Sequence, residues 1–202
     1  MNKIAFFLLS LTLALATTPV LAEGASSLLD DGTKADFIVT AGYTSGGDDL
    51  IDVEYERGGK DKITAGGEIL LGVGVVFLSN ENFELQLAAN YHFDDVSAEN
   101  GDASFERYPI DVLIFRRADR HRFGGGLTMH LSPSAEIDID GTGRETVNFE
   151  TAYGAVLEYD YQVLSKVWLG LRYTHISYAV DSIFRNSDID GSNFGLTVNF
   201  RF

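Results

Sequence analysis

The C-terminal ten residues, Asn193–Phe202, read NFGLTVNFRF. Every second position from Phe194 to Phe202 is apolar, and the positions between them are mostly polar. Successive side chains of a β-strand point to opposite faces, so this period of two predicts a strand with one apolar and one polar face. In a soluble protein the apolar face would meet a core. In a transmembrane barrel it would meet lipid, and the polar face would line the lumen.

Similar alternation recurs from Ala35 onward, and its clearest example runs from Phe83 to Phe93. Turn-forming stretches rich in glycine, asparagine, aspartate and serine separate the segments. The predicted strand segments are 36–44, 50–57, 63–78, 83–93, 107–115, 123–131, 148–159, 167–173 and 193–202.

Loop lengths alternate along this chain. Short turns are expected at 79–82, 117–120 and 162–166, and long, mostly acidic loops at 94–104, 132–145 and 180–192. A single-chain bacterial barrel has an even number of strands, with its short turns on the periplasmic side.

We therefore predict that 36–44 and 50–57 form one strand, kinked by glycines at 45–49, and that Gly58–Asp61 is a hairpin tip. The predicted fold class is all-β, an eight-stranded antiparallel transmembrane β-barrel. Eight strands leave an interior that side chains fill.

Aromatic residues gather near the predicted strand ends, as the interfacial girdles of membrane barrels do. They are Tyr43, Phe83, Phe93, Tyr108, Phe123, Phe149, Tyr159, Tyr173, Phe194 and Phe202. Alternation alone also permits a soluble calycin-like barrel. The aromatic C-terminal strand, the asymmetry of the loops and the N-terminal segment favour the membrane.

The N-terminal segment has the composition of a cleaved signal peptide. Lys3 provides positive charge, Ile4–Ala16 is a short apolar run, and Val20-Leu21-Ala22 is a small-residue cleavage site. We predict a signal peptide over 1–22, a periplasmic lead-in over 23–34 and the barrel over 35–202. No other stretch reaches 18 continuous apolar residues, so no transmembrane helix is expected.

The composition restricts the partners of the protein. The formal net charge is −15, which opposes binding to nucleic acid and to anionic lipid. A lipopolysaccharide surface bridged by divalent cations is compatible with that charge. Cysteine is absent, so neither disulfides nor a thiol nucleophile are available, and no cofactor is predicted.

From Ala35 to Phe202 the sequence resembles the small outer-membrane β-barrel superfamily of OmpA-, OmpX- and OmpW-type proteins. The resemblance implies the outer membrane of a Gram-negative bacterium, contact with outer-membrane lipid and lipopolysaccharide, and passage through the barrel-assembly machinery. By the same resemblance, Phe200 and Phe202 would form the assembly signal.

Polar residues of both charge signs are predicted to face the lumen. The expected network is Glu68, Glu84, Arg107, Asp111, Arg122, Glu150, Glu158, Arg172 and Arg201, with His92 and His130 also inward. Such residues form either a plug of paired charges or a narrow polar path for small solutes. The plug is favoured because eight strands leave little room.

The acidic loop Glu136-Ile137-Asp138-Ile139-Asp140 suggests weak binding of a divalent cation. A full EF-hand would need a bidentate glutamate at the twelfth position, which Val147 occupies. A solvated acidic loop is therefore the preferred interpretation, and no metal site is predicted.

His175 and Ser177 share the outward face of their strand, where a base and a hydroxyl could approach each other. The surrounding stretch resembles the H-x-S-N-A motif of the lipid A 3-O-deacylases. That resemblance implies Ser177 as nucleophile and His175 as general base. Tyr178 replaces the asparagine of the motif, and its orienting glutamate is missing, with Asp190 the nearest acid.

The preferred function is non-enzymatic: envelope structure, or surface contact with lipopolysaccharide, cations or other surface partners. A lipid A deacylase-like hydrolase using Ser177 and His175 is the first alternative. A narrow pore for small solutes is the second.

Overall fold

The structure is a computed structural model that describes residues 34–54, 60–78, 82–98, 101–139, 143–179 and 188–202. The predicted signal peptide and nearly all of the lead-in lie outside these residues, so both stay predictions. The chain divides into two compact units, and the strands form the second, Ala35–Phe202, with β1 beginning one residue earlier. No helix within the described residues is long and apolar enough to cross a membrane.

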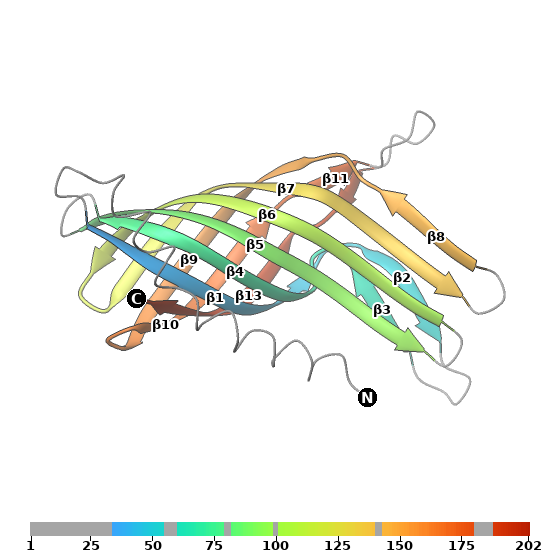
Figure 1. The fold of residues 1–202 in the computed structure, drawn as a ribbon, viewed down its shortest axis with the longest axis horizontal. Helices are drawn as coiled ribbons and strands as arrows, with labels where there is room; N and C mark the ends of the chain where they lie inside the picture. Colours follow the sequence, from blue (N-terminus) through green and yellow to red (C-terminus); the bar gives the residue numbers. More distant parts are fainter. Residues whose placement is uncertain (1–33, 55–59, 79–81, 99–100, 140–142, 180–187) are drawn as a thin grey trace, which may run out of the picture. The chain divides into compact units, whose positions relative to one another are not determined.

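The described ranges are almost entirely β-structure (Figure 1). The strands are β1 (Lys34–Gly46), β2 (Asp49–Glu54), β3 (Lys60–Thr64), β4 (Glu68–Leu78), β5 (Phe83–Ala98), β6 (Gly101–Ala118), β7 (His121–Ile139), β8 (Gly143–Asn148), β9 (Ala152–Leu164), β10 (Val167–His175), β11 (Ser177–Ala179), β12 (Asp188–Asp190) and β13 (Asn193–Arg201).

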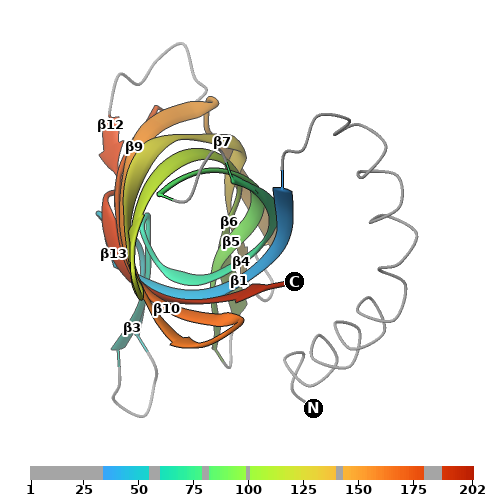
Figure 2. The ribbon, with the colours of Figure 1, turned by 90° about the vertical axis from the view of Figure 1, so that its left-hand side faces the viewer.

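Eight of these strands close into a ring, which Figure 2 shows from one end. The order around the wall is β1, β4, β5, β6, β7, β9, β10 and β13, and β13 pairs antiparallel with β1 to close it. The predicted eight-stranded antiparallel barrel is therefore confirmed. We call the end that carries the short β6–β7 and β9–β10 connections the turn end, and the opposite end the hairpin end.

The alternation of β13 appears in the structure as predicted. Phe194, Leu196 and Phe200 are exposed on the outer face, whereas Thr197 and Asn199 are buried inside the barrel. A wall that is apolar outside and polar inside is inverted relative to a soluble barrel.

Two predicted loops, 94–104 and 132–145, are wrong. Most of their residues belong to β5, β6, β7 and β8, and β6 and β7 reach 18 and 19 residues. The pattern reverses here, because small apolar side chains such as Ala103 point inward and polar ones outward. In the sequence, such a stretch of small and acidic residues is typical of a loop, which is why loops were predicted here.

The segments 36–44 and 50–57 are two strands, not one kinked strand. β1 ends at Gly46 and β2 begins at Asp49, while Gly46 and Gly47 have φ values of 134° and 80°. Those left-handed conformations suit glycine, so the predicted bend occurs where expected. Beyond it, however, β2 pairs with β3 in a separate two-stranded sheet. Residues 55–57 of the second segment and 58–59 of the predicted hairpin tip lie outside the described part of the chain.

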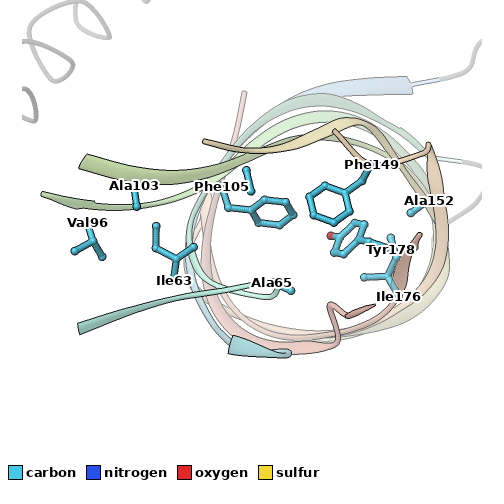
Figure 3. Packing of buried hydrophobic residues seen from close by; sticks show 10 residues of the cluster. Ile63, Ala65, Val96, Ala103, Phe105, Phe149, Ala152, Ile176 and Tyr178 are labelled. Carbon is cyan, nitrogen blue, oxygen red and sulfur yellow. The ribbon is translucent and has the colours of Figure 1, made fainter. Parts of the chain in front are cut away.

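An apolar cluster fills the inside of the hairpin end (Figure 3). Phe105 packs edge-on against both Phe149 and Tyr178, with ring centroids 5.6 Å apart in each pair. Phe149 was predicted in an outer girdle, but it is only 7% exposed and belongs to this cluster. The irregular residues between β8 and β9 change the strand parity there, which the sequence pattern concealed.

Candidate functional site

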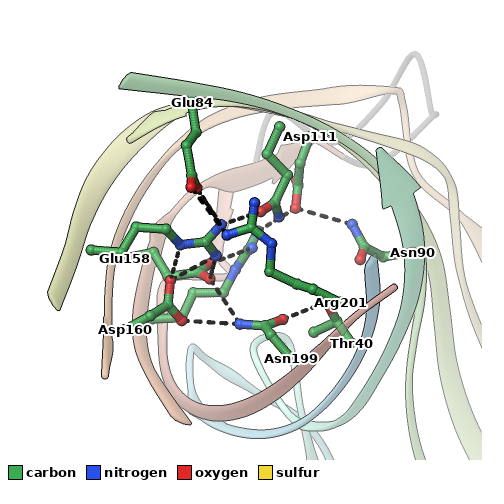
Figure 4. A network of polar contacts seen from close by, with 11 residues as sticks. Thr40, Glu84, Asn90, Asp111, Glu158, Asp160, Asn199 and Arg201 are labelled. Atoms are coloured by element: carbon green, nitrogen blue, oxygen red, sulfur yellow. Dashed lines mark hydrogen bonds and ion pairs between the residues drawn. The ribbon is translucent and has the colours of Figure 1, made fainter. Parts of the chain in front are cut away.

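The first candidate site is the polar network inside the barrel, shown in Figure 4. Arg122 on β7 lies at its centre, donating from Nε to Asp160 Oδ2 at 2.8 Å. Its Nη1 donates to Gln86 at 3.1 Å and to Glu84 at 3.3 Å. The guanidinium also lies 3.8 Å from the ring centroid of Phe115, a distance typical of cation–π contact.

Two more arginines extend this network around the lumen. Arg172 donates to Asp111 at 2.7 Å and to Glu158 at 3.1 Å. Arg201 donates to both carboxylate oxygens of Glu84, at 3.1 and 3.2 Å. Charges removed from water are tolerated only when they are paired and hydrogen-bonded, and each of these guanidiniums meets at least one carboxylate. The arrangement fits a plug of paired charges better than an open polar path.

Sequence reasoning missed several members of the network. Asp160 is fully buried, and Asn199 bridges Asp160 at 3.0 Å, Glu158 at 3.4 Å and Thr40 at 2.6 Å. The signal was available, because Asp160 shares the strand parity of Glu158, and Asn199 that of Arg201.

Two predicted members lie elsewhere. Glu150 is exposed and lies in the irregular stretch between β8 and β9. The change of strand parity that misplaced Phe149 also makes the predicted lumen position of Glu150 wrong. Glu68 is the first residue of β4 and is half-buried, and it is not among the residues that Arg122 contacts.

Arg107 belongs to a second layer, between the central network and the apolar cluster. It is fully buried, and its Nη2 donates to the Gly67 carbonyl at 2.5 Å and lies 3.0 Å from His92 Nε2. Thr44 approaches the same His92 nitrogen at 2.7 Å. His130 Nδ1 instead contacts the Tyr178 hydroxyl, also at 2.7 Å.

His92 and His130 therefore have different partners and do not share a site. Within the described ranges, no group of three or more His, Asp or Glu side chains is arranged to hold a metal ion. The layer joins the polar lumen to the apolar cluster above it.

The predicted acidic loop is part of a hairpin, where β7 pairs with β8. Arg144 on β8 contacts Glu136 and Asp138 on β7, each at 3.1 Å. The guanidinium of Arg144 therefore takes the place that a metal cation shared by Glu136 and Asp138 would need. Asp140, the third predicted ligand, lies outside the described residues.

The outward orientation of His175 and Ser177 agrees with the prediction, but the partner of the imidazole differs. His175 Nδ1 lies 2.9 Å from the Ser192 hydroxyl oxygen, while Ser177 pairs in register with Asp190. Hydrogen bonds from the Ser192 hydroxyl and backbone N–H lower the pKa of Asp190, with a smaller contribution from His175.

The order of these groups differs from that of a hydrolytic triad. A triad places the imidazole between the acid and the serine, whereas here Ser192 lies between His175 and Asp190. The Ser192 hydroxyl oxygen also accepts a hydrogen bond from the Ile176 N–H at 3.4 Å, so its partners are His175, Ile176 and Asp190. Nothing in this arrangement withdraws the proton of Ser177.

The predicted assembly residues lie at the turn end. Phe200 is 40% exposed and Phe202 57% exposed, and the backbone of Phe202 exchanges two hydrogen bonds with Phe37 of β1. The aromatic side chains therefore remain accessible, and their role in assembly stays a prediction.

Solved structures of known proteins share this fold. Ail, the attachment invasion locus protein of Yersinia pestis, solved with the heparin analogue sucrose octasulfate, is 10% identical with a TM-score of 0.54. The match covers 84% of this chain and 99% of Ail. Neisserial surface protein A is 13% identical with a TM-score of 0.48, over 85% of this chain and 100% of its own. At these identities the likeness concerns the fold alone. No curated protein matches the sequence.

A family model described as "outer membrane protein beta-barrel domain" matches residues 8–202. The match spans every strand of the barrel. The chain belongs to this family of outer-membrane β-barrel domains, whose place is the outer membrane of Gram-negative bacteria.

Proposed function

We propose that the protein is a sealed outer-membrane barrel whose work is done at the cell surface, through the sheet of β5, β6, β7 and β8. The observation that carries this proposal is the length of these strands. A tilted strand crosses the bilayer in about 9–11 residues. β7 has 19, so it extends well beyond the membrane at the hairpin end.

The filled lumen supports a role outside the pore. The rings of Phe105, Phe149 and Tyr178 lie inside the ring of strands (Figure 3), and so does the arginine–carboxylate network (Figure 4). A solute path would have to break ion pairs such as Arg172–Asp111 and also pass the rings of Phe105 and Tyr178.

The edge strand β8 is a suitable contact surface. Among the described strands it pairs only with β7, and all six of its residues are exposed. A strand edge presents unpaired N–H and C=O groups that can accept a further strand. We therefore expect a protein partner that pairs with β8 in extended conformation.

Charge restricts the partner further. The exposed or half-buried acids of these outer segments include Asp48, Asp49, Asp95, Asp102, Glu106, Glu136, Asp138, Glu145, Glu150, Asp188 and Asp190. The exposed bases whose side chains are described there are Lys62 and Arg144. Ail, in the structure compared above, holds a polyanion. This acidic surface favours basic segments or bridging divalent cations instead.

The first test is ion conductance in planar bilayers. A sealed lumen predicts no stable channels from the purified barrel, whereas a reproducible unit conductance would support the narrow-pore alternative. Unboiled samples that keep their faster gel mobility show that the barrel is folded.

The second test concerns β8, in bacteria that express the protein on an otherwise non-adherent surface. Adhesion to a cultured epithelial monolayer is compared for the wild type, Thr146→Pro and Val147→Pro. Neighbouring strand residues alternate in N–H direction, so one proline removes a donor facing β7 and the other a donor facing outward. The proline variant that removes the outward-facing N–H donor should abolish adhesion, while its β7–β8 hairpin should keep its resistance to protease. Adhesion equal to the wild type in that variant would contradict the role of the edge.

A further inference from the structure

The outer wall of the barrel carries an apolar groove of about 660 Å³. Its lining residues come from β1, β7, β9, β10 and β13. Most present apolar side chains on the outer face, and the inward-facing Glu158 and Arg172 also border it. The lining side chains are largely exposed, so this hollow lies outside the plugged lumen. Its volume is in the range of sites for small apolar ligands.

The strand registers give the direction of the groove. Phe123 pairs with Tyr159, Tyr159 with Leu171, Leu171 with Leu196, and Leu196 with Tyr43. These five residues form one row across five neighbouring strands. With about 4.8 Å between strands, the row is about 19 Å long. The groove therefore crosses the strands and is long and narrow.

The row is inclined within the membrane. Phe123 lies two residues from the start of β7 at the turn end, and Tyr43 three residues from the end of β1 at the hairpin end. Strands of such barrels tilt by about 45°, so a 19 Å line across them rises by about 13 Å. Half of the ~30 Å hydrocarbon core is about 15 Å. The row therefore runs from near the turn end toward the hairpin end over a depth of about half the hydrocarbon core.

The hairpin end of the groove is polar. Ser45 lies at its margin, in register with Phe194, whose ring packs 4.6 Å from that of Tyr173. Two residues further along the same outer faces are His175 and Ser192, which contact each other at 2.9 Å. Hydroxyl and imidazole groups at the end of an apolar groove suit an amphipathic ligand.

We propose that this groove binds one acyl chain of a membrane lipid, whose polar head lies beside Ser45 and the His175–Ser192 pair. The groove faces hydrocarbon, where water would find almost no polar partner along its wall. A symmetric contact would place the same hollow of a second copy against it and leave both unfilled. A flexible hydrocarbon chain fills a narrow hollow of this length.

The test uses the purified full-length barrel in detergent micelles with dimyristoyl phosphatidylethanolamine, and native mass spectrometry to count retained lipids. Leu171→Trp fills the middle of the groove. Val73→Trp is the matched control, because Val73 is an outward residue of β4 outside the groove, with 61% exposure against 57% for Leu171. Gel mobility before and after boiling verifies that all three proteins are folded.

The wild type and Val73→Trp should each retain one lipid, and Leu171→Trp should retain it about tenfold more weakly, since the lost contact covers several methylene groups. Equal retention by the three proteins would overturn the proposal. A lipid-free dimer that Leu171→Trp converts to monomer would also overturn it and assign the groove to a second copy.

Discussion

Arg122 and Asp160 face each other directly across the β7–β9 pair, and the guanidinium holds the carboxylate at 2.8 Å with both side chains fully buried. The same guanidinium reaches Glu84 on β5, on the far side of β6. One arginine therefore ties together parts of the wall that are not neighbours. The stability of the barrel should depend on such pairs, because their charges have no access to water.

Replacing Arg122 with methionine should lower the free energy of unfolding by about 3–5 kcal/mol, because it leaves the carboxylates of Asp160 and Glu84 buried without their cation. The fluorescence of Trp168, the sole tryptophan, reports unfolding in urea from within the lumen. Arg144→Met on the exposed hairpin is the control and should unfold like the wild type. Equal effects of the two replacements would mean that the lumen pairing contributes little.

Asp111 and Arg172 should be energetically coupled. Asp111→Asn and Arg172→Gln both disrupt the same ion pair, which has a length of 2.7 Å. The double variant should therefore lose less stability than the sum of the two single losses. We expect a coupling energy of about 1–3 kcal/mol from the double-mutant cycle in urea. Simple additivity would show that Glu158, the other partner of Arg172, carries the interaction instead.

The Asp190–Ser192 contact should titrate in acid. A native pKa below the ordinary value of about 3.9 means that the contact stabilises the fold above that pH and is lost as pH falls through the lowered native pKa. The nearby charged groups are His175, and Asp48, whose carboxylate accepts from the Asp190 N–H. The Ser192 amide signal in NMR spectra should therefore shift with a midpoint below about 3.9. Asp190→Asn should remove the titration, and an unchanged curve would contradict its assignment to Asp190.

Lipid A from cells that produce the protein should keep all its acyl chains, because within the described residues His175 contacts Ser192 and no base contacts Ser177. Mass spectrometry of lipid A compares the wild type with Ser177→Ala and Ser192→Ala. Loss of a hydroxyacyl chain in the wild type alone among the three would establish the hydrolase alternative. Loss that only Ser192→Ala abolishes would identify Ser192 as the nucleophile.

The regular part of the wall was readable from the sequence. Alternation in β13 and β5 predicted which side chains face outward, and eight strands followed from the loop asymmetry. Seven of the nine predicted network residues are buried in the barrel, because strand parity is a local property. Where the parity was interrupted, as between Val147 and Ala152, the predictions for Phe149 and Glu150 were wrong.

The amino-acid sequence by itself determined the class of the wall, apolar toward lipid and polar toward the lumen, because a period of two recurs along the strands that form it. Only the tertiary structure decided the partners. Asp160 meets Arg122, and His175 meets Ser192 instead of Ser177, because strand register brings together residues far apart in the chain. The outer groove depends on five strands at once, so no single segment could have revealed it.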